Sequence, residues 1–142
     1  MMRSALALIL LLGLLGQRPA VAEEPAAPDK VAVQQVISTQ MQAFQADDAG
    51  AAFALASPDL QAKFGSPAVF MDLVRSGYAP VYRPKVVEFR EIRAAARGPE
   101  QLVFVVGPDG RAYIAHYMME RQPDGSWRIN GCYLEPLGEE SV

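Results

Sequence analysis

The stretch SPDLQAKFGSPAVFMDLVRSGYAPVYRP, residues Ser57–Pro84, divides the chain into a helical first half and a β-rich second half. Ser57 and Ser66 each precede a proline, the pattern of a helix N-cap followed by proline in the first turn. Gly65 and Gly77 stand where left-handed helix ends are expected. The stretch therefore predicts two short helices. A change to extended structure should follow, because a proline disfavours the α conformation in the residue before it.

The segments on either side of this stretch predict the remaining elements. Upstream, Val31–Ala46 places apolar residues on one face of a helix, and Asp48 can cap a short alanine-rich helix after it. Downstream, strand patterns and the turns that separate them occupy 85–93, 102–106, 111–122 and 126–134. Helices followed by an antiparallel sheet of about four strands indicate an α+β fold, with the helices packed on one face of a curved sheet.

The turn at Pro123-Asp124-Gly125 suggests a register for the last hairpin. Pairing Gln122 with Ser126 places Glu120 opposite Arg128, a favourable cross-strand pair. One face then carries Tyr113, Ala115, Tyr117, Met119, Trp127, Ile129, Gly131 and Tyr133, and it should pack on the helices. The other face carries Ile114, His116, Met118, Glu120, Arg128, Asn130, Cys132 and Leu134, and it is a candidate homodimer surface. A slip of one residue would exchange these partners.

The N-terminus has the composition of a secretory signal peptide. Arg3 precedes an apolar run, Ala5–Gly16, and small residues end the segment at Ala22. The run is shorter than the roughly 20 residues of a membrane span. We therefore expect cleavage after Ala22 and a periplasmic or secreted protein with no stable membrane insertion. The expected organisation is a signal peptide (1–22), a flexible leader (23–30), one α+β domain (31–137) and an acidic tail (138–142).

Composition excludes several classes of function. The net charge of −3 disfavours nucleic acid as a partner, because phosphate binding needs clustered Lys and Arg. The single cysteine, Cys132, cannot form an internal disulfide. One histidine and one cysteine give no metal-ligand spacing, and there is no phosphate-binding loop, so we expect neither a metal nor a cofactor.

Two segments carry a resemblance to a known family. DDAGAAFALASPDLQAKFGSPAVFMDLVRSGYAPVYRP (47–84) and YMMERQPDGSWRINGCYLEP (117–136) resemble exported bacterial proteins grouped as domain of unknown function 4864. The order of elements also resembles the nuclear transport factor 2-like (cystatin-like) cone. The resemblance implies this fold, a pocket between sheet and helices, and a periplasmic address, but no activity. Enzymes and pure binding modules both occur on the cone, so function must be argued from the site.

Polar and aromatic residues of the sheet supply the candidate site. His116 is the only histidine, and Tyr113 or Tyr117 could present a hydroxyl to a cavity. In the predicted register Glu120 is roughly 13 Å from His116, too far to orient it. Candidate ligand-binding residues are Tyr78, Tyr82, Tyr113, Tyr117 and Trp127. Each of these residues could equally be an ordinary core or surface residue.

Three further groups have both a structural and a functional interpretation. Asp47-Asp48 could be a carboxylate pair or helix caps. Arg75, Arg83 and Lys85 could hold an anion or be solvated charges, and Cys132 could be reactive or a small apolar side chain.

The sequence favours a non-enzymatic exported module that binds a small apolar ligand, or a partner protein, through the pocket or the sheet face. The alternative is an isomerase- or dehydratase-like enzyme that transfers protons on a small apolar substrate, with His116, Tyr113 and Tyr117 as catalytic candidates.

Overall fold

The structure is a computed structural model that describes residues 26–138. The predicted signal peptide, its cleavage point at Ala22 and the last four residues of the acidic tail lie outside the described residues. The helices are α1 (Ala27–Gln45), α2 (Ala49–Ala54), α3 (Pro58–Phe64), α4 (Pro67–Gly77) and α5 (Ala79–Tyr82). The strands are β1 (Val86–Arg93), β2 (Glu100–Val106), β3 (Ala112–Arg121) and β4 (Trp127–Pro136).

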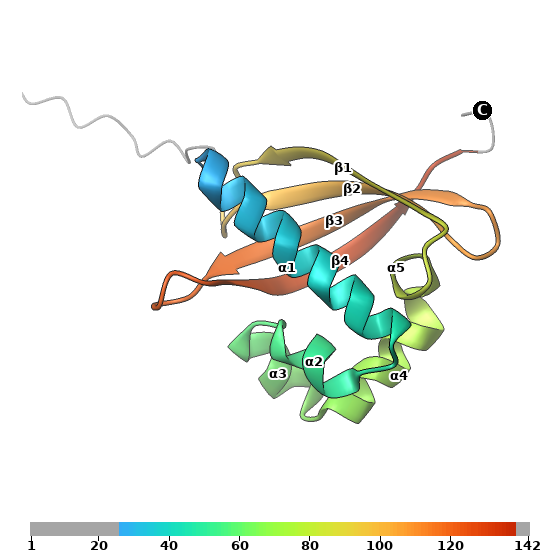
Figure 1. The fold of residues 1–142 in the computed structure, drawn as a ribbon, viewed down its shortest axis with the longest axis horizontal. Coiled ribbons are helices and arrows are strands. Elements are labelled where there is room, and N and C mark those ends of the chain that lie inside the picture. Colours follow the sequence, from blue (N-terminus) through green and yellow to red (C-terminus); the bar gives the residue numbers. More distant parts are fainter. Residues whose placement is uncertain (1–25, 139–142) are drawn as a thin grey trace, which may run out of the picture.

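The fold is α+β, as predicted. Every strand pairs antiparallel with its neighbour in the chain, giving one open sheet in the order β1-β2-β3-β4. Figure 1 shows α1 crossing one face of this sheet, with α2, α3 and α4 grouped together beside it. This arrangement is consistent with the nuclear transport factor 2-like cone. Among residues 26–138, no helix is both long and apolar enough to cross a bilayer.

The predicted helix caps are confirmed. Ser57 accepts a hydrogen bond from the backbone N–H of Leu60 at 3.2 Å, and Ser66 accepts one from Val69 at 3.3 Å. The side chain of Asp48 caps α2 in the same way. These bonds satisfy backbone donors that the first turn of a helix would otherwise leave unpaired.

Two helix boundaries differ from the prediction. The helix α1 begins at Ala27, inside the expected leader 23–30, because proline and aspartate are both well tolerated in a first helical turn. Asp29 in that turn forms an ion pair with Arg121 of β3 at 3.7 Å. At the other boundary, Gly77 is the last residue of α4 and lacks a left-handed conformation. The chain then makes the one-turn helix α5 before it becomes extended.

Two apolar clusters form the core. In the first, the buried face of α1 (Val33, Ile37 and Met41) packs on Val103, Val105, Ala115, Tyr117, Met119, Trp127 and Ile129 of the sheet. In the second, Phe44 near the end of α1 packs on α2 and α4, with Ala43, Ala52, Phe70, Met71 and Val74. Because the second cluster contains no strand residue, it forms a compact helical end to the domain.

The predicted hairpin register holds near the turn and fails beyond it. Glu120 pairs with Arg128, as expected, but Met119 pairs with Ile129 and Met118 with Gly131, so Asn130 is an extra residue in β4. Such a β-bulge reverses which face the following residues occupy. Cys132 and Leu134 therefore pack against the helix-covered core, whereas Tyr133 joins His116 on the opposite face.

Candidate functional site

A cavity of about 260 Å³ lies between α1, α3, α4 and the sheet. It can hold roughly a dozen non-hydrogen atoms, since an apolar cavity of about 150 Å³ accommodates benzene. Its apolar lining residues come from both core clusters and from the sheet: Phe44, Leu60, Phe64, Phe70, Leu73, Val74, Val81, Met118 and Ile129. Polar lining residues are Gln40, Lys63, Tyr78, Tyr117, Asn130 and Cys132. None of the described lining residues is an aspartate or a glutamate.

Helical spacing on α3 and α4 builds one wall of the cavity. On α3, Leu60, Lys63 and Phe64 follow the i, i+3, i+4 pattern and so share a face. On α4, Phe70 stands between the rings of Phe53 and Phe64, with centroids 5.7 and 5.4 Å away. The wall is therefore aromatic and is anchored by one fully packed phenylalanine.

Tyr117 of β3 is the most deeply buried polar residue of the lining, with 1% of its surface exposed. Among the described residues its hydroxyl has no hydrogen-bond partner. Burial raises the pKa of Tyr117 well above its ordinary value, and burial raises the pKa of the neighbouring Cys132 thiol to about 12. Both groups are therefore neutral at pH 7. The nearest polar group to the phenol is the Cys132 thiol, which is only a weak hydrogen-bond acceptor.

The β-bulge brings Asn130 into the cavity wall. Its side-chain oxygen accepts a hydrogen bond from the Ser57 hydroxyl at 2.7 Å, and the backbone N–H of Ser57 donates to Ile129 at 2.8 Å. These bonds fasten the start of α3 to β4. Within the described residues the amide nitrogen of Asn130 has no acceptor, and Asn130 is a lining residue of the cavity.

The predicted ligand-binding residues do not share one site. Tyr78 and Tyr117 line the cavity, as the prediction requires. Tyr113 instead lines a separate hollow beside α5, and Trp127 lines a groove between α1 and the β3–β4 hairpin. Tyr82 packs on Phe44, with ring centroids 6.2 Å apart, and donates its hydroxyl to Asp47. Tyr113, Tyr117 and Trp127 all lie on the predicted, helix-covered face. They separate because a strand pattern fixes a face but not a position along it.

His116 lies on the sheet face opposite the cavity, since neighbours in a strand point to opposite sides. Its Nδ1 is 2.6 Å from Glu100 Oε1, and its Nε2 is 3.3 Å from Glu135 Oε1. The ring of Tyr133 stacks on it with centroids 4.2 Å apart. The carboxylate partners of His116 are therefore Glu100 and Glu135, and not Glu120. Among the described residues, no group of three or more His, Cys, Asp or Glu side chains is arranged to hold a metal ion.

Glu100 is the buried centre of this polar cluster. Arg93 donates to its second oxygen at 3.1 Å. Burial raises the pKa of Glu100, but the hydrogen bonds from Arg93 and His116 outweigh it and hold that pKa below its ordinary value of 4.5. A carboxyl with a lowered folded-state pKa stabilises the fold above its ordinary pKa, and this contribution disappears as the pH falls through the lowered pKa.

Glu100→Gln should therefore lower the free energy of unfolding at pH 7 by about 1–3 kcal/mol. When the pH falls below 4.5, the variant should lose less of its free energy of unfolding than the wild type does. Urea unfolding at a series of pH values measures both effects. Glu88→Gln, at an exposed glutamate of β1 that pairs with Arg90, is the matched control. Identical pH profiles for the two variants would contradict a special role for Glu100.

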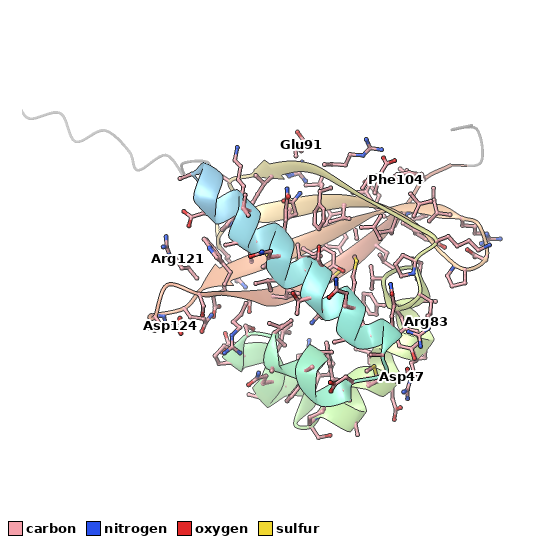
Figure 2. The ribbon with its side chains drawn as sticks, viewed as in Figure 1. Asp47, Arg83, Glu91, Phe104, Arg121 and Asp124 are labelled. Carbon is pink, nitrogen blue, oxygen red and sulfur yellow. The ribbon has the colours of Figure 1, made fainter. Side chains whose placement is uncertain are left out.

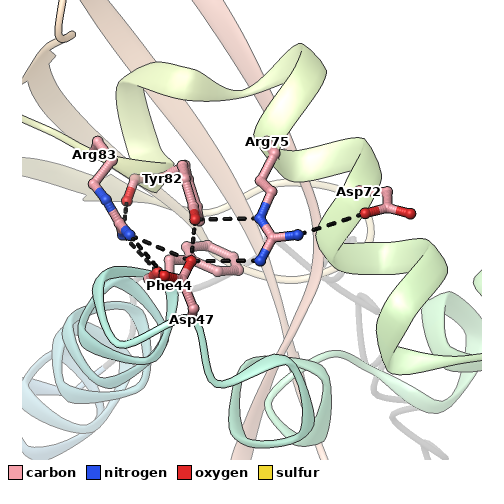
Figure 3. Close-up of polar contacts among 6 residues, drawn as sticks. All are labelled: Phe44, Asp47, Asp72, Arg75, Tyr82 and Arg83. Atoms are coloured by element: carbon pink, nitrogen blue, oxygen red, sulfur yellow. Dashed lines mark hydrogen bonds and ion pairs between the residues drawn. The ribbon is translucent and has the colours of Figure 1, made fainter.

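A second polar cluster joins the helical elements at the far end of α1. Asp47, which has a positive φ of 55°, accepts hydrogen bonds from Tyr82, Arg83 and Arg75 (Figure 3). The hydrogen bond from Tyr82, with Arg83 and Arg75, holds the pKa of Asp47 below its ordinary value. Figure 2 shows Asp47 and Arg83 at the end of α1 far from the β3–β4 turn. The two arginines are thus engaged with a carboxylate, which favours the structural interpretation of both charged groups.

Three residues of these sites have a position in the structure that differs from the one predicted from the sequence. Glu100 falls in a segment expected to be a loop, and Asn130 was assigned to the opposite face. Lys63 looks like an ordinary exposed helix residue, yet it lines the cavity and forms no ion pair with another described residue. Its spacing from Leu60 and Phe64 was the one available signal.

The helices on one face of a four-stranded antiparallel sheet, with a cavity between them, define a small α+β domain of the cone type. Residues 26–142 match the family described as Domain of unknown function (DUF4864). This match covers most of the chain, so the chain belongs to the DUF4864 family. No curated protein and no solved structure shows significant similarity to it.

Proposed function

We propose that this chain is an exported, non-enzymatic module of the nuclear transport factor 2-like superfamily that binds a small apolar ligand in the cavity between helices and sheet. The observation that carries the proposal is the aromatic cavity, which is open to a ligand and has a few polar side chains among its lining residues. Apolar walls with a few polar groups are the usual composition of a small-molecule site. The basic and apolar N-terminal segment supports export to the periplasm or the medium.

A proton-transfer enzyme is the weaker proposal. Such an enzyme needs a base near the reacting carbon and a donor for the developing charge. Tyr117 could serve as the donor, but none of the described residues lining the cavity is a carboxylate or a histidine. His116, with its carboxylate partners, lies on the opposite face of the sheet. The candidate groups are thus divided between two places, which favours binding over turnover.

Two exposed apolar residues of α4 provide a matched test of binding. Leu73 is 40% exposed and lines the cavity, whereas Val69 is 53% exposed and lies outside its lining. With the fluorescent probe 1-naphthylamine, which is small enough for the cavity, Leu73→Asp should raise the Kd at least about tenfold, because a charge at the lining opposes entry of an apolar molecule. Val69→Asp should leave the Kd unchanged. Equal effects of the two substitutions would contradict binding in this cavity.

Native mass spectrometry on protein isolated from its own cells tests the same proposal without a surrogate probe. An added mass that disappears on denaturation is the expected result, and its identity would name the ligand. Protein that carries no added mass and binds no probe would overturn the proposal and redirect the search to partner proteins.

We also propose that the outer sheet face pairs with a second copy of the chain. The apolar side chains of that face belong to neither core cluster, so no described helix residue packs with them there. Val86 on this face is 40% exposed, and its neighbours Phe104 and Ile114 are half-buried. Ile114→Lys should convert a dimer to monomers, because it places a charge inside the contact. Light scattering coupled to size exclusion measures this change, with Val69→Asp as control. A wild-type monomer would contradict the pairing.

A further inference from the structure

We propose that the ligand of this cavity carries a hydrogen-bond donor, either an O–H or an N–H group, whose hydrogen bond the side-chain oxygen of Gln40 accepts. The inference rests on the proposed function and adds the chemical class of the ligand. A hydrocarbon, a ketone or an ether would fill the same space but would leave this oxygen unpaired.

Gln40 is a polar residue on the buried face of α1. It follows Ile37 by three positions and precedes Phe44 by four, so the three side chains lie on one stripe of the helix. Gln40 is 3% exposed, and it lines the cavity. A buried amide needs partners for both its nitrogen and its oxygen, because losing contact with water without replacing its hydrogen bonds costs free energy.

The amide nitrogen of Gln40 is paired, but its oxygen is not. Nε2 donates to the backbone carbonyl of Ala52 at 3.1 Å, and because a carbonyl can only accept, this bond fixes which end of the amide is the nitrogen. No described residue donates to Oε1. Among the buried and half-buried residues of the described chain, only the Tyr117 hydroxyl is both unpaired and without appreciable accessible surface. The unpaired Oε1 of Gln40 therefore keeps accessible surface, and the space beside Gln40 is the cavity.

The other described side chains of the lining offer no acceptor of equal strength. The oxygen of Asn130, the second amide of the lining, already accepts from the Ser57 hydroxyl at 2.7 Å. The described lining residues include no aspartate or glutamate, and the ammonium group of Lys63 can only donate. Gln40 thus presents the strongest free side-chain acceptor of the described lining, and a donor on the ligand complements it.

Asn130 favours a hydroxyl as the source of this donor. Its amide nitrogen has no acceptor among the described residues, and Asn130 lines the same cavity as Gln40. A hydroxyl oxygen accepts a hydrogen bond as well as donating one, whereas the nitrogen of an aromatic amine is a poor acceptor. A ligand with a hydroxyl group therefore has a partner to offer to each of the two side chains, and an amine has one for Gln40 alone.

Three probes of nearly equal size test the proposal: 1-naphthol, 1-naphthylamine and 1-fluoronaphthalene. The first two donate a hydrogen bond and the third does not. In the wild-type protein at least one of the two donors should bind about three- to tenfold more tightly than 1-fluoronaphthalene, although the fluoro compound is the more apolar. The fluorescence of 1-naphthylamine gives its own Kd, and its displacement gives the other two. Tighter binding of 1-naphthol identifies an O–H ligand, and tighter binding of 1-naphthylamine identifies an N–H ligand.

Gln40→Met, which removes the amide at nearly constant length, should abolish the preference for the donors. Loss of the bond to Ala52 acts on all three probes alike, so the readout is the ratio of Kd values within the variant. Gln35→Met, the same substitution at an exposed residue of α1 outside this lining, should keep the preference.

Two results would overturn the inference and leave the binding function standing. One is a wild type that binds 1-fluoronaphthalene at least as tightly as both donors, a result that does not depend on whether Gln40→Met folds. The other is a preference for the donors that survives Gln40→Met. Failure of every probe to bind would overturn the proposed function itself.

Discussion

Phe70→Ala is expected to lower the free energy of unfolding by roughly 3–5 kcal/mol, a large part of the stability of a domain of this size. Phe70 is 7% exposed, and its ring centroid lies 6.1 Å from that of Phe44, 5.7 Å from Phe53 and 5.4 Å from Phe64. Truncation removes the central ring of the second core cluster, and the surrounding helices cannot close the space completely.

The same substitution should weaken binding of the fluorescent probe, because Phe70 forms part of the cavity wall. Guanidinium unfolding followed by circular dichroism measures the stability change. Leu73→Ala, at a neighbouring residue of α4 that is 40% exposed, should cost less than about 1 kcal/mol. Similar costs for the two variants would show that the aromatic cluster contributes little to the cooperative unfolding of the domain.

Gly98→Ala is expected to cost at least about 2 kcal/mol, because two separate effects oppose a side chain there. Gly98 has a φ of +126°, and a Cβ at this position would lie 2.5 Å from the carbonyl oxygen of Met119. That oxygen belongs to backbone and cannot rotate away. The β1–β2 connection is held against β3 at this point, since the backbone N–H of Met119 donates to Pro99 at 2.9 Å.

Gly110→Ala provides the control for backbone conformation alone. Gly110 has a φ of +83°, but an added Cβ there would meet nothing within 4 Å. We expect it to cost about 1 kcal/mol, the penalty for a positive φ without a steric clash. Thermal unfolding of both variants gives the comparison. A cost for Gly98→Ala no greater than for Gly110→Ala would mean that the connection can move away from β3.

Local chemistry made most of the fold predictable. The caps at Ser57, Ser66 and Asp48 depend on hydrogen bonds that span three residues, so a single sequence displays them directly. The hairpin register near Pro123–Gly125 was equally readable, because a turn fixes the pairing beside it. Helix order and the strand count followed from these signals.

The parts that escaped prediction depend on contacts between distant residues. The bulge at Asn130 is held by Ser57, which lies 73 positions away in the chain. The partnership of Glu100 with His116 escaped prediction because β2 begins at Glu100, whereas the predicted strand begins at Leu102. Tyr78 and Tyr117 line the cavity. The division of the other aromatic residues among separate surfaces depends on the positions of the helices, which the sequence does not display.

The strand order has a consequence for how quickly the chain can fold. Because each strand pairs with its neighbour in sequence, all pairings in the sheet close short loops, and the second core cluster draws only on the helical half. Short loops close at little entropic cost, and chains rich in such contacts fold rapidly. The slow step should then be the meeting of the two halves, where Ser57 reaches Asn130 and Ile129. The cavity lies between these halves, so it forms only with that last event.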